Sequence, residues 1–295
     1  MNQTHESTKN VPVQIVNAFV KNGKGGNPAG VVLDADGYSE DEKLSIAQQV
    51  GLSETAFVSQ SKSEGFKLDF FTPTMRIAHC GHATIATFSY LASLDLVSDG
   101  QTSKETVDGP RKIILDKGMA YMEQLAPSYQ EIELGPVLES LGLTHGDLDA
   151  DIPVFRVNTG NSFIVLAVKD QQTLQVIEPK LALVNEISEK LDLIGYYIFT
   201  TDSNELDATA RMFAPRYGIM EEAATGMAAG PLACLLWDKV GLNKTTIQIG
   251  QGDFMKTPSP SLITVNLEVE EGKITGLLSG GYGQVMKDMV VSIKC

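Results

Sequence analysis

An internal repeat is the feature of this sequence that most constrains its fold. The segment 70–90 (FFTPTMRIAHCGHATIATFSY) returns in altered form at 211–235 (RMFAPRYGIMEEAATGMAAGPLACL). Both copies place an aromatic residue shortly before a proline, continue as an irregular loop, and end in a helix start rich in small residues. The second copy aligns with the first after a three-residue insertion in its loop. A chain that carries one unit twice is expected to fold as two related halves.

The elements predicted around the two copies keep the same order. Ser39 and Glu42 form a capping-box pattern at the start of one helix, and a helix predicted over 180–191 begins 141 residues later (180 minus 39). Strands predicted over 66–71 and 209–214 are offset by 143 residues (209 minus 66), and helices over 81–94 and 226–240 by 145 (226 minus 81). So steady an offset indicates duplication. The other predicted elements are strands over 13–20, 29–33, 113–116, 119–124, 130–134, 154–157, 162–168, 195–201, 246–250, 261–268, 273–279 and 284–293, a strand that follows 52–58, and a short helix over 135–142.

These patterns predict an α/β (α+β) fold of two pseudo-symmetric, barrel-like domains. Each domain is a curved sheet wrapped around one long helix, 81–94 in the first and 226–240 in the second. The expected boundaries are a disordered tail over 1–10, a first half over 11–146 and a second half over 152–295. The acidic stretch 147–151 is the expected linker. At 295 residues, the chain is long enough for each half to bury its own core.

Composition narrows the class of partner. Lys and Arg total 23 against 37 Asp and Glu, and the resulting net charge of −14 repels nucleic acid and anionic membranes. The chain has neither an apolar run that could span a bilayer nor the start of a secretion signal, so the expected compartment is the cytoplasm. Three cysteines without CxxC spacing and four scattered histidines predict no disulfide framework and no metal site. The glycines of 22–28 predict a wide hairpin turn, because no P-loop lysine follows them.

The helix start in each repeat is a candidate anion site. Gly81-His82-Ala83 and Gly226-Met227-Ala228 carry glycine and alanine where a ligand would approach the backbone. The first amides of a helix lack intrahelical partners and carry partial positive charge, so they bind carboxylate or phosphate. The alternative is that the small residues serve tight packing between helix and sheet. Their occurrence in both copies favours a ligand site.

Cys80 precedes the first helix and Thr225 the second. A thiol at a helix start can be a nucleophile or base, but Thr225 is too weakly acidic to complete a two-thiol racemase, and Cys234 lies about two turns into its helix. A small buried residue is therefore the favoured interpretation of Cys80. Glu54 lies where a predicted helix meets a strand. It is either a solvated loop carboxylate, which composition alone favours, or a functional carboxylate.

At these residues the chain resembles the PhzF family of phenazine biosynthesis-like proteins, which are related in fold to diaminopimelate epimerase. The matching segments span nearly the whole chain and include NAF…GGNPAGVV (17–32), GLSETAFV (51–58), FFTP…CGHATIAT (70–87), RMFAPRYGI…ATGMAAG (211–230) and IGQGDFM (249–255). The resemblance implies two barrel-like domains with the active site between them. It also implies an isomerase without a cofactor, commonly a homodimer.

The resemblance assigns roles to individual residues. The Glu of SETAF, Glu54 here, is the family's acid/base, and a buried carboxylate base is expected to have a raised pKa. With it the catalytic residues are Glu54, His82 and Glu222, and the substrate-binding residues are Gly81, Ala83, Gly226 and Met227. Three positions depart from the family pattern: Glu222 replaces an Asp, Met227 replaces a Ser, and Arg76 replaces a Glu. Arg76 would favour a more anionic ligand if it faces the cleft.

The predicted function is acid/base proton transfer on a small carboxylate-bearing metabolite. Glu54 would take the proton from carbon and return it elsewhere, while His82 and Glu222 polarise or reprotonate the substrate. The partner expected is thus a small anionic metabolite, with no nucleic acid and no membrane. The alternative is a non-catalytic metabolite-binding protein on the same scaffold, which Met227 and Glu222 favour.

Overall fold

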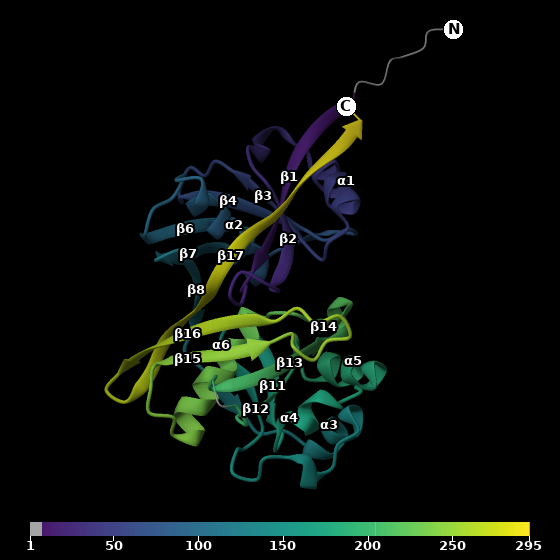
Figure 1. The fold of residues 1–295 in the computed structure, drawn as a ribbon, viewed down its shortest axis with the longest axis vertical. Coiled ribbons are helices and arrows are strands. Elements are labelled where there is room, and N and C mark those ends of the chain that lie inside the picture. The colour runs from purple at the N-terminus through teal and green to yellow at the C-terminus, as the bar shows by residue number, and fades with distance from the viewer. Residues whose placement is uncertain (1–7, 204, 295) are drawn as a thin grey trace. The chain divides into compact units, whose positions relative to one another are not determined.

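The protein is described by a computed structural model that covers residues 8–203 and 205–294 (Figure 1). It divides into two compact units. Unit 1 contains the described residues 8–18, Pro28–Met122 and 282–294, and unit 2 contains Phe19–Asn27 and the described residues of Glu123–Gly281. This division differs from the contiguous halves predicted from the sequence, because the C-terminal strand belongs to the same sheet as the N-terminal strand.

Strand pairing explains the shared sheet. β1 (Thr8–Ala18) pairs antiparallel with β17 (Lys273–Lys294), from Thr8 opposite Lys294 to Ala18 opposite Gly283. Figure 1 shows the two strands side by side. Residues 8–10 of the predicted disordered tail are therefore strand, and residues 1–7 of it lie outside the described residues.

The predicted linker is also corrected. Residues 145–147 form a 3₁₀ turn, and the Asp149 amide donates to Ala167 O, so this acidic stretch belongs to unit 2 and does not connect two units.

Unit 1 is a closed eight-stranded ring with one helix on each side of its sheet. From β17 the order of pairing is β1, β2, β3, β4, β6, β7 and β8, and β8 pairs again with β17. Two-residue β5 adds to β4. The bounds are β2 Asn27–Val32, β3 Thr55–Ser59, β4 Phe66–Phe71, β5 Arg76–Ile77, β6 Gly100–Thr106, β7 Gly109–Asp116 and β8 Met119–Leu125.

The two helices of unit 1 have different surroundings. α1 (Glu40–Val50) begins at the predicted capping box of Ser39 and Glu42 and ends at Gly51, whose φ of 70° suits glycine. Its buried Ile46 and Ala47 pack in one cluster with residues of β1, β2, β3, β4 and β17. α2 (Gly81–Ser93) contacts β1 and β3, and ten of its residues between Gly81 and Leu91 are buried. α2 is the central helix predicted over 81–94.

Unit 2 repeats the pairing pattern of unit 1. Its strands pair in the order β9, β10, β11, β12, β13, β15, β16 and β17, and β14 adds to β13. β11–β12 and β13–β15 are parallel, as β2–β3 and β4–β6 are in unit 1. The duplication inferred from the sequence is thus present in the topology. The bounds are β9 Ser128–Gln130, β10 Phe155–Asn158, β11 Ser162–Ala167, β12 Gly195–Thr200, β13 Ala208–Ala214, β14 Ile219–Glu222, β15 Thr246–Gln251 and β16 Ser261–Glu270.

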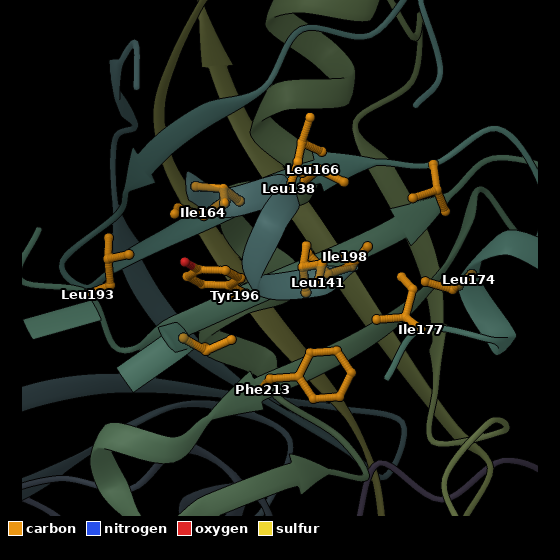
Figure 2. Packing of buried hydrophobic residues seen from close by; sticks show 13 residues of the cluster. Leu138, Leu141, Ile164, Leu166, Leu174, Ile177, Leu193, Tyr196, Ile198 and Phe213 are labelled. Carbon is orange, nitrogen blue, oxygen red and sulfur yellow. The ribbon is translucent and has the colours of Figure 1, made fainter. Parts of the chain in front are cut away.

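The helices of unit 2 cover both faces of its sheet. α3 (Leu134–Leu141), α4 (Gln171–Gln175) and α5 (Leu181–Lys190) bury an apolar layer against β11, β12 and β13, which Figure 2 shows around Tyr196, Ile198 and Phe213. Successive strand residues point to opposite faces. α6 (Gly226–Leu235) contacts β10, β11, β12 and β16 and continues as a π-helical turn over Leu236–Val240, so the predicted central helix 226–240 is two segments.

Several predicted boundaries were wrong. The strands expected over 273–279 and 284–293 are one 22-residue strand, β17, which runs through Gly280-Gly281 without a turn. The strand expected over 130–134 is the short β9, after which α3 begins at Leu134. Short or strongly polar elements were missed, namely β5, β6, β14 and α4. Among the described residues, no helix combines the length and apolar character needed to cross a membrane.

Candidate active site

Glu54 and His82 form a buried pair in unit 1. Glu54 lies between Gly51, where α1 ends, and Thr55, where β3 begins, and its carbonyl accepts the Gly30 amide at 3.0 Å. His82 stands in the first turn of α2. His82 Nε2 lies 3.2 Å from Glu54 Oε2, and the two residues are 4% and 8% exposed. Glu54 is therefore not the solvated loop carboxylate that composition alone allowed.

The pKa of Glu54 corrects the expectation of a raised value. Burial raises this pKa, but the hydrogen bond and the charge of the His82 ring oppose burial and hold the pKa below its ordinary value. A minor contribution comes from the Ser53 side chain. Glu54 is therefore a carboxylate at neutral pH, which is the form that can accept a proton.

Cys80 is the N-cap of α2 and lies on the other side of the His82 ring. Its Sγ is 3.5 Å from His82 Nδ1, and the residue is 5% exposed. Burial raises the pKa of the thiol, and the His82 ring offsets this only in part. A protonated thiol is a weak nucleophile, so the geometry agrees with the interpretation of Cys80 as a buried apolar residue.

Glu54, Cys80 and His82 bring three potential metal-ligand atoms within 4.8 Å of one another. Two of these residues already face each other across 3.2 Å, and the positive end of α2 opposes a bound cation. The arrangement is therefore better suited to proton transfer than to ligation. The expectation of no metal stays a prediction.

Gly81 and Ala83 complete the first turn of α2 and are both buried. Cys80 makes no side-chain cap hydrogen bond, and the first turn contains no acidic residue. The Thr84 amide donates to Cys80 O at 3.3 Å, so the helical bonding starts there. The assignment of Gly81 and Ala83 to substrate binding remains a prediction.

Glu222 lies in unit 2 and is held by neutral donors. Its Oε1 accepts from Asn27 Nδ2 at 2.9 Å, and its Oε2 accepts from the Thr225 hydroxyl. Asn27 Nδ2 also donates to Ala224 O at 3.0 Å, which ties the glycine-rich loop to the start of α6. The neighbouring Glu221 points elsewhere and pairs with Arg211 at 2.8 Å. The two adjacent carboxylates thus have separate surroundings.

Gln251 anchors the same region from the end of β15. Its Oε1 accepts from Thr225 N at 3.1 Å and from Tyr197 OH at 2.9 Å. Its Nε2 donates to Glu222 O at 2.7 Å and to Thr225 Oγ1 at 3.2 Å. All four hydrogen-bonding positions of this fully buried amide are used, so it fixes the loop from Glu222 to Thr225.

Gly226 and Met227 have structural partners inside unit 2. A Cβ on Gly226 would lie 2.9 Å from Phe19 Cζ and 3.1 Å from Ser279 Oγ, so close packing requires glycine here. Its carbonyl accepts from Gln124 and Ser279. Met227 is half-buried, and its Sδ accepts from Asn161 Nδ2 at 3.4 Å. The packing interpretation therefore explains Gly226 without a ligand, and substrate binding by either residue stays a prediction.

Arg76 does not offer the charge that the sequence suggested. Its two terminal nitrogens bond the carboxylates of Asp69, at 2.5 Å, and Glu40. Asp69 also accepts Lys43 Nζ at 2.6 Å. The Arg76 charge is thus matched inside unit 1.

Sequence reasoning missed three residues: Asn27 and Gln251, described above, and Lys104 of β6. Lys104 Nζ lies 3.2 Å from His79 Nδ1 and 2.5 Å from Thr84 Oγ1, beside the start of α2. Asn27 and Gln251 lie in the matched segments GGNPAGVV and IGQGDFM, which offered a signal, whereas Lys104 lies in a polar strand that offered none.

Comparison with known proteins places these residues in a family context. The family model PhzC-PhzF, described as phenazine biosynthesis-like protein, matches residues 16–287. An uncharacterized isomerase of Clostridium acetobutylicum is 32% identical over 236 residues, which cover 75% of this chain and 77% of that protein. A trans-2,3-dihydro-3-hydroxyanthranilate isomerase of Pseudomonas chlororaphis is 27% identical over 280 residues, 91% of this chain and 95% of that protein.

Solved structures confirm the fold. A PhzF-family phenazine biosynthesis protein of Bacillus anthracis has a TM-score of 0.86 at 25% identity, covering 96% of this chain and 99% of that one. A hydroxyproline epimerase of Agrobacterium vitis has a TM-score of 0.60 at 12% identity, with 100% and 95% covered. The latter likeness concerns the fold alone. It agrees with the predicted architecture of epimerase type.

Proposed function

Since the chain belongs to the PhzC-PhzF family of phenazine biosynthesis-like proteins and is an isomerase, we propose a proton transfer as its reaction. The proton moves within a small carboxylate-bearing metabolite. The observation that carries the proposal is the buried pair of Glu54 and His82, 3.2 Å apart. An ionised carboxylate held by an imidazole inside a protein is suited to general acid/base work. No step in the scheme uses a cofactor.

Glu54 is the proposed base. Its carboxylate removes a proton from carbon, and the resulting carboxyl group, whose proton exchanges with water, protonates another carbon of the same molecule. The enzyme therefore ends the cycle in its starting protonation state. His82 orients the carboxylate through Nε2 and stabilises its charge. The family resemblance gives Glu222 a part in the same reaction, as the group that polarises or reprotonates the substrate, and we retain that role in the proposal.

The substrate class follows from backbone chemistry and from the relatives. Amides in the first turn of α2, around Gly81 and Ala83, and of α6, around Gly226 and Met227, are the proposed contacts for a substrate carboxylate. Such donors would also stabilise negative charge that develops on the substrate. The relative from Pseudomonas chlororaphis is named for a substrate that carries a carboxylate, which supports the class. We further propose a homodimer in the cytoplasm that binds neither nucleic acid nor membrane.

Deuterium incorporation tests the proposal. Small carboxylic acids, including trans-2,3-dihydro-3-hydroxyanthranilate, are first screened for thermal stabilisation of the protein, and each hit is then incubated with enzyme in heavy water. Wild type is expected to place solvent deuterium on carbon and to form an isomer, as seen by mass spectrometry and proton NMR. Glu54→Gln should abolish both, and Glu131→Gln, at an exposed carboxylate, should abolish neither.

Two outcomes contradict the scheme. Normal exchange in Glu54→Gln would remove Glu54 from its role. Acids that stabilise wild type but never exchange or isomerise would favour the alternative of a non-catalytic metabolite-binding protein.

A further inference from the structure

Lys104 is a buried cation that the proposed chemistry does not use. It lies on β6 and is 0% exposed, whereas lysine is almost never fully buried unless it is paired. Within the part of the chain that the structure describes, no carboxylate lies within salt-bridge distance of its Nζ. Burying an ammonium without a counterion costs several kcal/mol. A residue kept at such a cost calls for a compensating role.

Its contacts are all in the segment that carries the proposed site. Lys104 Nζ lies 3.2 Å from His79 Nδ1 and 2.5 Å from Thr84 Oγ1. It also lies 4.9 Å from the centre of the Phe70 ring, which makes a T-shaped contact with the His79 ring. Three acceptors, a ring nitrogen, a hydroxyl and a π face, thus match the three N–H bonds of an ammonium group.

These contacts bracket the start of α2. An ammonium group can only donate, so His79 Nδ1 must accept, and the His79 proton is then fixed on Nε2. Thr84 Oγ1 accepts from Lys104 and donates to Cys80 O at 2.6 Å. Lys104 thereby holds the His79 ring directly and, through the Thr84 hydroxyl, the Cys80 carbonyl. Between these two points lie Gly81 and His82.

We propose that Lys104 is a positioning residue, which holds the turn from His79 to Thr84 so that His82 meets Glu54. The proposal rests on the function proposed above for Glu54 and His82. Lys104 touches neither of these side chains, and it acts through the hydrogen bonds from His79 and Thr84. Its loss would let the turn relax and would misalign the imidazole with the carboxylate.

Electrostatics adds a pH dependence to this geometry. The pKa of Lys104 is lowered to about 7, chiefly by burial; Cys80 opposes this shift, Arg111 adds to it, and Asp108 opposes it weakly. Burial, Lys104 and Arg111 together hold the pKa of His79 well below its ordinary value, so His79 is neutral and able to accept. Near neutral pH the Lys104 amine therefore exchanges between a form that donates to both partners and one that can itself accept from one of them.

Nitrogen-15 NMR of the histidine rings tests the positioning role without an assay of function. The chain has four histidines, and a His79→Gln variant assigns the signal of interest. In wild type below pH 7, where Lys104 is protonated, His79 is expected to show an unprotonated Nδ1 and a protonated Nε2. Lys104→Met should mix the two tautomers of His79 and shift the ring signals of His82, while Lys62→Met, at an exposed lysine, should leave both unchanged.

Kinetics supplies the second readout. Once a converted acid is known, Lys104→Met should lower kcat by about tenfold and change KM by less than about twofold, because misalignment acts on the reacting geometry rather than on binding. Lys104→Gln keeps one N–H donor and should recover part of the loss. It also serves as the test variant if Lys104→Met does not fold.

The outcomes separate the two proposals. Unchanged His79 and His82 signals in a folded Lys104 variant would overturn the positioning role, as would unchanged kcat. Failure of both variants to fold would reduce Lys104 to a structural residue and overturn it too. If wild type neither exchanges nor isomerises any bound acid, the proposed function fails, while the NMR result still decides whether Lys104 controls the turn.

Discussion

The two copies of the repeat share a backbone but differ in chemistry. Each copy has a short strand beside the strand before it, β5 beside β4 and β14 beside β13, and then a buried helix, α2 or α6. At the start of α2, ionisable groups dominate: Glu54, His79, Cys80, His82 and Lys104. At the start of α6, one carboxylate, Glu222, is surrounded by the neutral donors of Asn27, Thr225 and Gln251.

The two helix starts thus differ in how each holds its carboxylate. In unit 1, an imidazole holds Glu54, and its charge and hydrogen bond lower the Glu54 pKa. In unit 2, two neutral side-chain groups donate to Glu222, and neither of them titrates near neutral pH. The first copy is therefore suited to move a proton, whereas the second is suited to hold the Glu222 carboxylate in one place.

The largest expected effect separates the two carboxylates. Glu54→Gln should lower the rate of solvent exchange by about 10²–10⁴-fold, because general base catalysis contributes this much. Glu222→Gln should lose turnover but keep exchange within about tenfold of wild type, because the base that breaks the C–H bond is still present. Mass spectrometry of the recovered acid in heavy water measures exchange, and the appearance of isomer measures turnover. Equal losses of exchange in the two variants would show that Glu54 and Glu222 do not have separate roles.

The second prediction concerns the buried charge of unit 1. The Lys104 pKa is about 7 in the folded protein and 10.5 ordinarily, so between these values the unfolded chain binds more protons and folding stability rises with pH. Lys104→Met lacks this titration. The free energy of unfolding of wild type relative to this variant should therefore increase across the window, by up to about 5 kcal/mol.

Urea unfolding at pH 7 and pH 9.5 measures the trend. Lys62→Met, at an exposed lysine, should follow wild type at both values. Parallel pH curves for wild type and Lys104→Met would show that Lys104 is not a titrating buried group.

The third prediction concerns the Asn27 side chain, which donates to Glu222 and to Ala224 in unit 2. Asn27→Ala removes a part-buried hydrogen bond to Glu222 Oε1 and a buried one to Ala224 O, and should lower the free energy of unfolding by about 1–3 kcal/mol. Turnover should fall while exchange persists, as for Glu222→Gln. Asn243→Ala, at an exposed loop position, is the matched control and should change neither. Full turnover in Asn27→Ala would show that the position of Glu222 does not depend on its hydrogen bond from Asn27.

Local sequence signals predicted much of the fold. The capping box of Ser39 and Glu42 and the strand predicted over 66–71 depend on neighbours in sequence. β17 depends on distant partners instead. Its Gly280-Gly281 pair has the composition of a turn, but Gly280 is opposite Thr264 within a continuous ladder. Pairing of this kind, and the resulting division of the chain into units, is not encoded locally.

The candidate site shows the same limit. Glu54, His82 and Glu222 could be named because they lie in segments that resemble the family. Lys104 could not be, because β6 reads GQTSKET, a polar run typical of an exposed strand, and only the packed structure shows that this lysine is covered. The lowered pKa of Glu54 escaped prediction for a related reason, since its sign depends on the distance to His82.

The smallest expected effect tests the side chain that first looks reactive. Cys80 and Thr225 occupy equivalent positions, and if neither reacts covalently, Cys80→Ala should change the exchange rate by less than about threefold, as for other substitutions away from the reacting groups. Burial raises the pKa of this thiol, so it stays protonated and contributes little at neutral pH. Cys234→Ala, at a buried cysteine in α6, controls for the loss of a buried thiol as such. A hundredfold loss of exchange in Cys80→Ala alone would make the first copy a thiol site and reassign the base from Glu54.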